Sequence, residues 1–180
     1  MVDLSTARQQ QVLASTPLLR QLPPATRLVL RGGPQVMAAA PDALSLPRSE
    51  TPCQAVRNDI RAALWLGPDE RLLLGSADAA AEMHGLLQRA LAGVAHSLVD
   101  ISHGQVGFEV SGARAALALN TGCPLDLDPA SFPIDMCTRT VFAKAQIVLW
   151  RTGAMTFRLE TARSFAPYVT EILALAGRES

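Results

Sequence analysis

The 180-residue chain has little charge and few aromatic side chains. Only 18% of its residues are charged and 4% are aromatic, and 16 basic side chains balance 16 acidic ones. A net charge of zero, with scattered basic residues, offers no electrostatic surface for nucleic acid or for an anionic membrane. So little charge predicts an apolar face that a protein partner covers. The alternative is an alanine-rich protein whose small side chains inflate the apolar fraction.

Long apolar runs, a signal peptide and cysteine motifs are also missing. No apolar stretch approaches the roughly 20 residues of a membrane-spanning helix. The first residues include Asp3 and form no continuous apolar region, so we expect no secretory signal. Cys53, Cys123 and Cys137 are odd in number and widely spaced. This pattern predicts reduced thiols and a cytoplasmic location.

Motifs of metal binding and nucleophilic catalysis are absent from the sequence as well. It contains no CxxC, HxxxH, HExxH or GxSxG. His96 and His103 flank Asp100, but in an extended segment the two histidines lie about 20 Å apart. We therefore expect solvated or hydrogen-bonded histidines, and we predict no catalytic, cofactor-binding or metal-ligating residue in this chain.

Two loop segments allow both a functional and a structural interpretation. Gly32 and Gly33 precede Pro34 and could cradle a phosphate, but the Lys and Thr of a P-loop are lacking, which favours a simple turn. Asp126 and Asp128 could form a pair of carboxylates about 6–7 Å apart. Because Pro124 and Pro129 bracket them, a surface loop or a helix cap is the favoured interpretation.

Tryptophan and arginine residues near the predicted strands also leave two interpretations open. Trp65 and Trp150 are predicted to pack in the core, or else to anchor a partner. Arginine side chains could clamp carboxylates along one edge, or could be solvated strand charges. These are Arg151, Arg158 and Arg163.

An internal duplication organises the chain. The segments that begin at Ala63 and Val148 both indicate strand, turn, strand, helix and glycine, with Trp65 on Trp150 at an offset of 85. Upstream, residues 28–47 mirror residues 108–127, a strand that enters a helix of small residues. The pattern predicts an α+β fold of tandem ferredoxin-like βαββαβ units. The predicted divisions are an N-terminal arm (1–24) outside the repeat, a first unit (25–104) and a second unit (105–180), packed as one domain.

Four segments resemble one known family. They are ALWLGPDERLLL from Ala63, SLVDISHGQVGFEVSG from Ser97, GCPLDLDPASFP from Gly122 and LWRTGAMTFRLETARSFAPYV from Leu149. Together they are similar to the gamma subunit of bacterial heterotetrameric sarcosine oxidase, over about residues 25–178. One departure is Arg71, which stands where that family commonly has a tryptophan.

The resemblance implies an accessory, non-catalytic subunit of an oxidoreductase complex. The family's fold is similar to the folate-binding module of aminomethyltransferases, and Asp100-Ile101-Ser102 with Gly112–Ala115 resembles a signature of that module. The resemblance implies alpha, beta and delta partner subunits, with FAD, FMN, NAD and substrate held by partners and no cofactor in this chain. The complex would demethylate sarcosine to glycine and hydrogen peroxide, and to 5,10-methylenetetrahydrofolate when tetrahydrofolate is present.

Two other functions stay open on the sequence. A stand-alone folate- or amine-binding transferase would need a buried carboxylate, for which Asp100 is the one candidate. The competing role of Asp100 is to order the turn at Ser102-His103-Gly104. A ligand-sensing ferredoxin-like domain is the third possibility.

Overall fold

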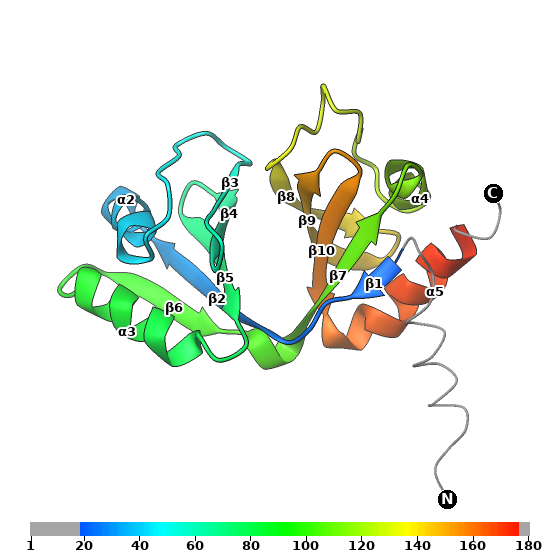
Figure 1. The fold of residues 1–180 in the computed structure, drawn as a ribbon. Coiled ribbons are helices and arrows are strands. Elements are labelled where there is room, and N and C mark those ends of the chain that lie inside the picture. The colour runs from blue at the N-terminus through cyan, green and yellow to red at the C-terminus, as the bar shows by residue number, and fades with distance from the viewer. Residues whose placement is uncertain (1–18, 177–180) are drawn as a thin grey trace, which may run out of the picture. The chain divides into compact units, whose positions relative to one another are not determined.

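The chain folds into two α+β units, each built on a five-stranded sheet (Figure 1). The computed structural model describes residues 19–176. Within them, unit 1 comprises residues 19–22, 106–134 and 139–176, and unit 2 comprises residues 23–105 and 135–138. The predicted α+β class and the ferredoxin-like units are confirmed.

Unit 2 contains five strands and two helices. The strands are β2 (Ala25–Gly32), β3 (Ala55–Arg57), β4 (Ala62–Gly67), β5 (Glu70–Ser76) and β6 (His96–Asp100), in the order β3-β4-β5-β2-β6. Helices α2 (Pro34–Ala43) and α3 (Ala80–Ala90) lie on one face of this sheet. Strands β2, β4, β5 and β6 with the two helices form the ferredoxin-like set, and β3 adds an edge strand.

The core of unit 2 lies between this sheet and its two helices. Leu28 and Leu30 of β2 pack with Leu73 of β5 and with Met83 and Leu87 of α3. These side chains alternate along the strands and recur at 3,4 spacing along α3, as the sequence predicts.

Strand β5 also approaches α3 closely at one glycine. A Cβ atom on Gly75 would lie 2.6 Å from the Met83 sulfur. Only glycine therefore lets α3 pack this near to β5 without a shift of the Met83 side chain.

Helix α3 is shorter than the sequence predicts. The 3,4-spaced apolar side chains that include Met83 and Leu87 predict a helix over about residues 77–92 with Gly93 as its C-cap, whereas α3 spans Ala80–Ala90. The Ser76 hydroxyl donates to Asp78 at 2.7 Å and holds this stretch in a turn before the helix begins. Gly93, the expected C-cap, lies beyond the observed cap residue Leu91 and has a φ of +76°.

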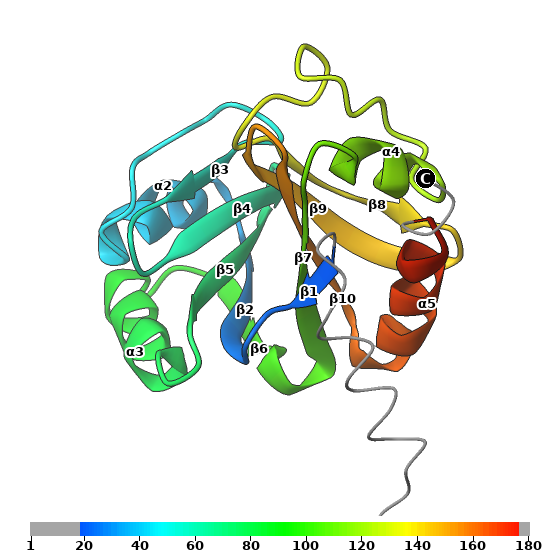
Figure 2. The same cartoon turned by 45° about the vertical axis from the view of Figure 1, so that its right-hand side comes forward.

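Unit 1 repeats this architecture with a different chain order. Its elements are β1 (Leu19–Gln21), β7 (Gln105–Ser111), α4 (Ala115–Asn120), β8 (Cys137–Phe142), β9 (Ala145–Gly153), β10 (Thr156–Ala162) and α5 (Ala166–Ala176). The strand order is β1-β7-β10-β9-β8. Figure 2 shows α4 and α5 on one side of this sheet. None of the helices between residues 19 and 176 has the length and apolar character that crossing a membrane requires.

The fourth ferredoxin-like strand of unit 1 comes from the start of the described chain. In unit 2 the position beside β2 belongs to β6, which follows α3. In unit 1 the corresponding position beside β7 belongs to β1, with Leu19 opposite Val110 and Gln21 opposite Phe108. The sequence placed these residues in an arm outside the repeat, so for Leu19–Gln21 that prediction was wrong. The rest of the expected arm, up to residue 18, lies outside the described residues.

The two hairpins correspond at an offset of 86 rather than the expected 85. Trp65 pairs with Arg71 beside a bulge in unit 2, and Arg151 pairs with Phe157 beside the same irregularity in unit 1. The structural counterpart of Trp65 is therefore Arg151, and not Trp150. In both hairpins an aromatic residue and an arginine form this cross-strand pair. The aromatic residue lies on the first strand of the hairpin in unit 2 and on the second strand in unit 1.

The position of β1 predicts that a short strand stabilises all of unit 1. Leu19 is 3% exposed. We expect Leu19→Ala to lower the free energy of unfolding by about 2–5 kcal/mol, because it removes a buried side chain and leaves a cavity. Denaturant titration measures this loss. The matched control is Gln21→Ala on the same strand, which is exposed and should change stability by less than about 0.5 kcal/mol. Equal effects of the two variants would contradict the assignment.

Candidate functional site

Arg151 is a buried guanidinium that holds a loop. It is 4% exposed, and its Nη1 donates to the carbonyl oxygens of Leu127 at 3.1 Å and Phe132 at 2.9 Å. Its Nη2 donates to the carbonyl oxygen of Ala154 at 2.5 Å. The guanidinium carbon also lies 5.0 Å from the centre of the Phe157 ring. Arg151 is neither a carboxylate clamp nor a solvated strand charge, since backbone carbonyls take up its donors.

The two aspartates of the Pro-rich loop serve the loop itself. Asp126 accepts hydrogen bonds from the Asp128 N–H at 3.0 Å and from the Ser131 hydroxyl at 2.6 Å. Asp128 accepts from the Ala130 N–H at 2.9 Å. The Ser131 hydroxyl lowers the pKa of the Asp126 carboxyl. This geometry agrees with the surface-loop interpretation and gives neither carboxylate an acid–base partner.

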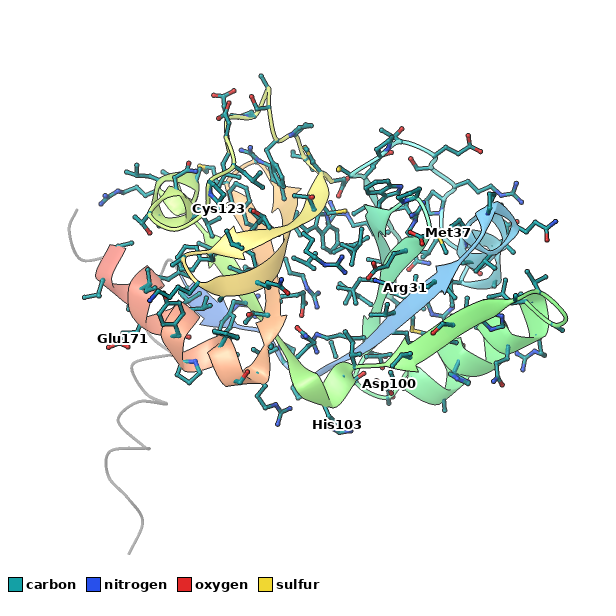
Figure 3. The ribbon with its side chains drawn as sticks, turned by 180° about the vertical axis from the view of Figure 1, so that it is seen from behind. Arg31, Met37, Asp100, His103, Cys123 and Glu171 are labelled. Carbon is teal, nitrogen blue, oxygen red and sulfur yellow. The ribbon has the colours of Figure 1, made fainter. Side chains whose placement is uncertain are left out.

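Asp100 orders the turn between β6 and β7 (Figure 3). Its Oδ1 accepts from the Ser102 N–H at 2.8 Å and from the Ser102 hydroxyl at 2.5 Å. The Ser102 Oγ in turn accepts from the Arg27 N–H of β2 at 2.8 Å. Asp100 is exposed, and the Ser102 hydroxyl lowers the pKa of its carboxyl. The stand-alone transferase needs a buried carboxylate, and Asp100 does not meet that requirement.

The remaining arginines and the tryptophans lie in separate places. Arg158 pairs with Glu160 at 2.6 Å, and Glu160 is 2% exposed. Arg163 is exposed after β10, so the three arginines do not gather along one edge. Trp150 is 4% exposed, which agrees with core packing. Trp65 is half-buried, and the Arg71 guanidinium carbon lies 5.7 Å from its ring centre.

The two glycines that precede α2 serve packing and capping. A Cβ atom on Gly32 would lie 2.6 Å from a methyl group of Val36, so glycine allows α2 to approach β2. The Gly33 carbonyl accepts from the N–H groups of Val36 and Met37 at the start of the helix. This is the turn that the sequence favours over a phosphate site.

The cysteine thiols are free, and two of them lie on neighbouring segments. The Cys137 N–H donates to the carbonyl oxygen of Cys53 at 2.7 Å, beside an antiparallel bridge between Gln54 and Met136. Burial raises the pKa of the Cys137 thiol to about 12, and burial also raises the pKa of the Cys123 thiol. Sequence reasoning missed the proximity of Cys53 and Cys137, because no local pattern joins positions so far apart.

No described residues group three or more histidine, cysteine, aspartate or glutamate side chains in a metal-binding arrangement. His96 instead has its Nδ1 2.7 Å from the Val94 carbonyl oxygen, and Asp100 is engaged by Ser102. The buried charges described above are held by backbone or by an opposite charge.

Comparison with known proteins identifies the family. The profile of the sarcosine oxidase gamma subunit family matches residues 20–179. The chain belongs to the sarcosine oxidase gamma subunit family. A curated family member, the sarcosine oxidase subunit gamma of Corynebacterium sp. (strain P-1), is 32% identical over 174 residues, which cover 94% of this chain and 84% of the relative. The resemblance stated from four sequence segments is thereby confirmed.

Solved structures agree with the family assignment. A chain of the heterotetrameric sarcosine oxidase from Corynebacterium sp. U-96, in complex with pyrrole 2-carboxylate, superposes with a TM-score of 0.84 at 28% identity. The match covers 96% of this chain and 91% of that chain. The glycine cleavage system aminomethyltransferase T from Bartonella henselae superposes with a TM-score of 0.66 at 14% identity, over 95% of this chain and 51% of that one. This second likeness concerns the fold alone, and it confirms the expected similarity to the aminomethyltransferase fold.

The carbonyl contacts of Arg151 predict that this side chain holds the loop in place. We expect Arg151→Leu to leave the Leu127 and Phe132 carbonyls without a donor, at a cost of about 1–3 kcal/mol for each unpaired buried group. Amide hydrogen exchange of residues 127–134 should therefore become faster. The control is Arg163→Leu, which changes an exposed arginine and should leave both stability and exchange unaltered. Unchanged exchange in Arg151→Leu would contradict the loop-holding role.

The hydrogen bonds of Asp100 predict a pH-dependent contribution to stability. The pKa of this carboxyl is lowered in the folded chain, mainly by the Ser102 hydroxyl. The carboxylate therefore stabilises the fold above the unfolded pKa of about 4, and this contribution disappears as pH falls through the lower folded value. The free energies of unfolding of the native chain and of Asp100→Asn should differ at pH 7, and this difference should disappear as the pH falls through the lowered folded pKa of the carboxyl. A difference that does not depend on pH would refute the turn-ordering charge.

Proposed function

We propose that this chain is the non-catalytic gamma subunit of a heterotetrameric sarcosine oxidase. The complex would demethylate sarcosine oxidatively to glycine and hydrogen peroxide, and would form 5,10-methylenetetrahydrofolate when tetrahydrofolate is present. The alpha, beta and delta subunits would be the partners, and they would hold FAD, FMN, NAD and the substrate. The assembly would work in the cytoplasm.

The observation that carries this proposal is the family match over residues 20–179. The similar solved chain belongs to a heterotetrameric sarcosine oxidase, which supports a place for this chain in a complex of the same kind. Both matches span nearly the whole described chain, so the likeness concerns the entire subunit and not one shared module.

The state of the ionisable groups supports an accessory role. Burial raises the pKa of the Cys137 thiol to about 12, so this thiol is protonated at neutral pH. Asp100 and Asp126 accept hydrogen bonds within their own turns, and Arg151 serves backbone carbonyls. Catalytic carboxylates and nucleophiles instead need a partner base or an accessible substrate position.

Exposed apolar side chains support a protein partner. Helix α5 buries Val169 and Leu173, while Phe165, just before it, and Leu175 within it are 40% and 54% exposed. Tyr168 packs edge-on against Phe165 at 6.4 Å between ring centres. Further large apolar side chains are exposed on other elements: Ile60, Val99, Leu117, Ile134, Val141 and Met155. Exposed apolar surface is typical of chains that associate with others.

Copurification tests the proposed function. The tagged chain is expressed together with the alpha, beta and delta subunits from the same source, and the purified material is analysed by native mass spectrometry and by its flavin absorbance. We expect one copy of each subunit, a flavin spectrum, and hydrogen peroxide formation from sarcosine. Omission of this chain should reduce the yield of assembled complex, because an accessory subunit supports assembly and not chemistry.

The isolated chain serves as the control. It should form no hydrogen peroxide from sarcosine, and calorimetry should detect no micromolar binding of tetrahydrofolate. Micromolar folate binding by the chain alone, without any association with a flavin-bearing partner, would favour the stand-alone transferase and overturn the proposal.

A further inference from the structure

Two free thiols of unit 2 lie directly across an antiparallel pair of segments. Gln54 and Met136 form an antiparallel bridge, with the Ala55 N–H donating to the Asp135 carbonyl and the Cys137 N–H donating to the Cys53 carbonyl, both at 2.7 Å. Cys53 and Cys137 are therefore the next opposed pair along this ladder. The Cα atoms of such a hydrogen-bonded pair lie about 5.5 Å apart. A disulfide requires a Cα separation of about 4.4–6.8 Å, and the separation expected for two residues joined by such a bond lies within this range.

The two thiols differ in their exposure. Cys53 is half-buried and has a φ of +58°, a conformation that few residues other than glycine adopt. Cys137 is fully buried, and its thiol donates to the Trp65 carbonyl oxygen at 3.5 Å. A small oxidant therefore reaches Cys53 more readily than Cys137.

Charged groups line the same place. Burial raises the pKa of the Cys137 thiol, and the Arg71 guanidinium, which stacks over Trp65, lowers it in part. The carboxylate of Asp135, which pairs with Arg57 at 3.2 Å, opposes this effect. A neighbouring cation favours a thiolate, so Arg71 offsets part of the cost of burial when Cys137 loses its proton.

We propose that Cys53 and Cys137 form a peroxide-driven thiol–disulfide pair. The Cys53 thiolate attacks hydrogen peroxide, the O–O bond breaks, and Cys53 becomes a sulfenic acid while one oxygen leaves as water after protonation. The Cys137 thiol then attacks the Cys53 sulfur, the S–O bond breaks, and the thiol proton passes to the departing hydroxyl, which leaves as a second water. Two thiols are oxidised to one disulfide and one peroxide is reduced to two waters.

The site has a structural consequence for unit 2. Cys137 lies in residues 135–138, which belong to unit 2 although they occur in the second half of the chain. A disulfide would fasten this segment covalently to the loop that precedes β3. Such a long-range cross-link restricts the unfolded chain, so the oxidised form should be the more stable one.

The proposed thiol chemistry does not depend on the proposed function. A sarcosine oxidase assembly would supply hydrogen peroxide as its own product, which would make this oxidant locally available. Reagent hydrogen peroxide tests the pair without that assembly, so a failure of either proposal can be distinguished from a failure of the other.

Peptide mass spectrometry of the full chain tests the pair. The chain is treated with hydrogen peroxide, alkylated without reduction and digested at aspartate residues, which separates Cys123 from Cys137. We expect a peptide containing Cys53 joined to one containing Cys137, two hydrogen atoms lighter than the separate thiols, and its loss on treatment with dithiothreitol. The midpoint of thermal unfolding should rise on oxidation and return on reduction.

Three variants test which of the thiols take part in the reaction. Cys137→Ala should accumulate a Cys53 sulfenic acid that dimedone traps, and Cys53→Ala should give neither the link nor the trapped acid. Cys123→Ala is the matched control, because it removes a buried thiol in unit 1 and should form the link as the native chain does. If Cys137→Ala does not fold, the linked peptide of the native chain still tests the pair, because Cys53 is only half-buried and can be oxidised in the folded chain. An unoxidised Cys53, its direct passage to sulfinic acid, or a link that involves Cys123 would overturn the proposal.

Discussion

The architecture depends on the pairing of β1 with β7. A ferredoxin-like sheet needs a strand beside its first strand, and in unit 1 no strand follows α5 within the described residues. Leu19–Gln21 fill that position by pairing with Phe108–Val110 across most of the first half of the chain. The Arg20 guanidinium adds an ion pair with Glu109 at 3.1 Å on the exposed side. Without this pairing, the backbone groups along one side of β7 would lack hydrogen-bond partners, and the buried Leu19 side chain would be missing from the apolar side of the sheet.

Duplication of a unit does not duplicate its chemistry. The two hairpins place an aromatic ring and a guanidinium at the same cross-strand position, but Arg71 lies over Trp65 in one and Arg151 lies over Phe157 in the other. At the next positions, Leu72 and Leu74 of β5 correspond to Arg158 and Glu160 of β10. An apolar pair in one unit is therefore an ion pair in the other. The shared backbone pattern fixes where side chains point, and each unit fills those positions differently.

Local sequence patterns predicted the helices and turns that depend on interactions between residues close together in the chain. The 3,4-spaced apolar side chains of α3 are a local pattern that predicts a helix, and Met83 and Leu87 lie on its buried side. Pro68 lies in the turn between β4 and β5, where its fixed φ suits the turn. Strand β1 could not be predicted, because a strand of three residues gives too short an alternation to detect. The role of Arg151 could not be predicted for a different reason. An arginine in a strand usually faces solvent, and only the tertiary structure places backbone carbonyls around its guanidinium. Cys53 and Cys137 became neighbours through a non-local bridge, which no motif search covers.

The interlaced topology constrains how the chain can be made. As the polypeptide leaves the ribosome, β1 emerges before β7 and must remain unpaired until β7 has been synthesised. The paired residues Arg20 and Glu109 are separated by 89 positions in the sequence. Strands β2 to β6 are complete before that moment, so most of one sheet can close while the other still lacks its first partner. Cutting the gene between the two units would consequently deprive the later unit of its edge strand. A fragment that begins at residue 105 is therefore not an independent folding unit, although its sequence repeats that of the first unit.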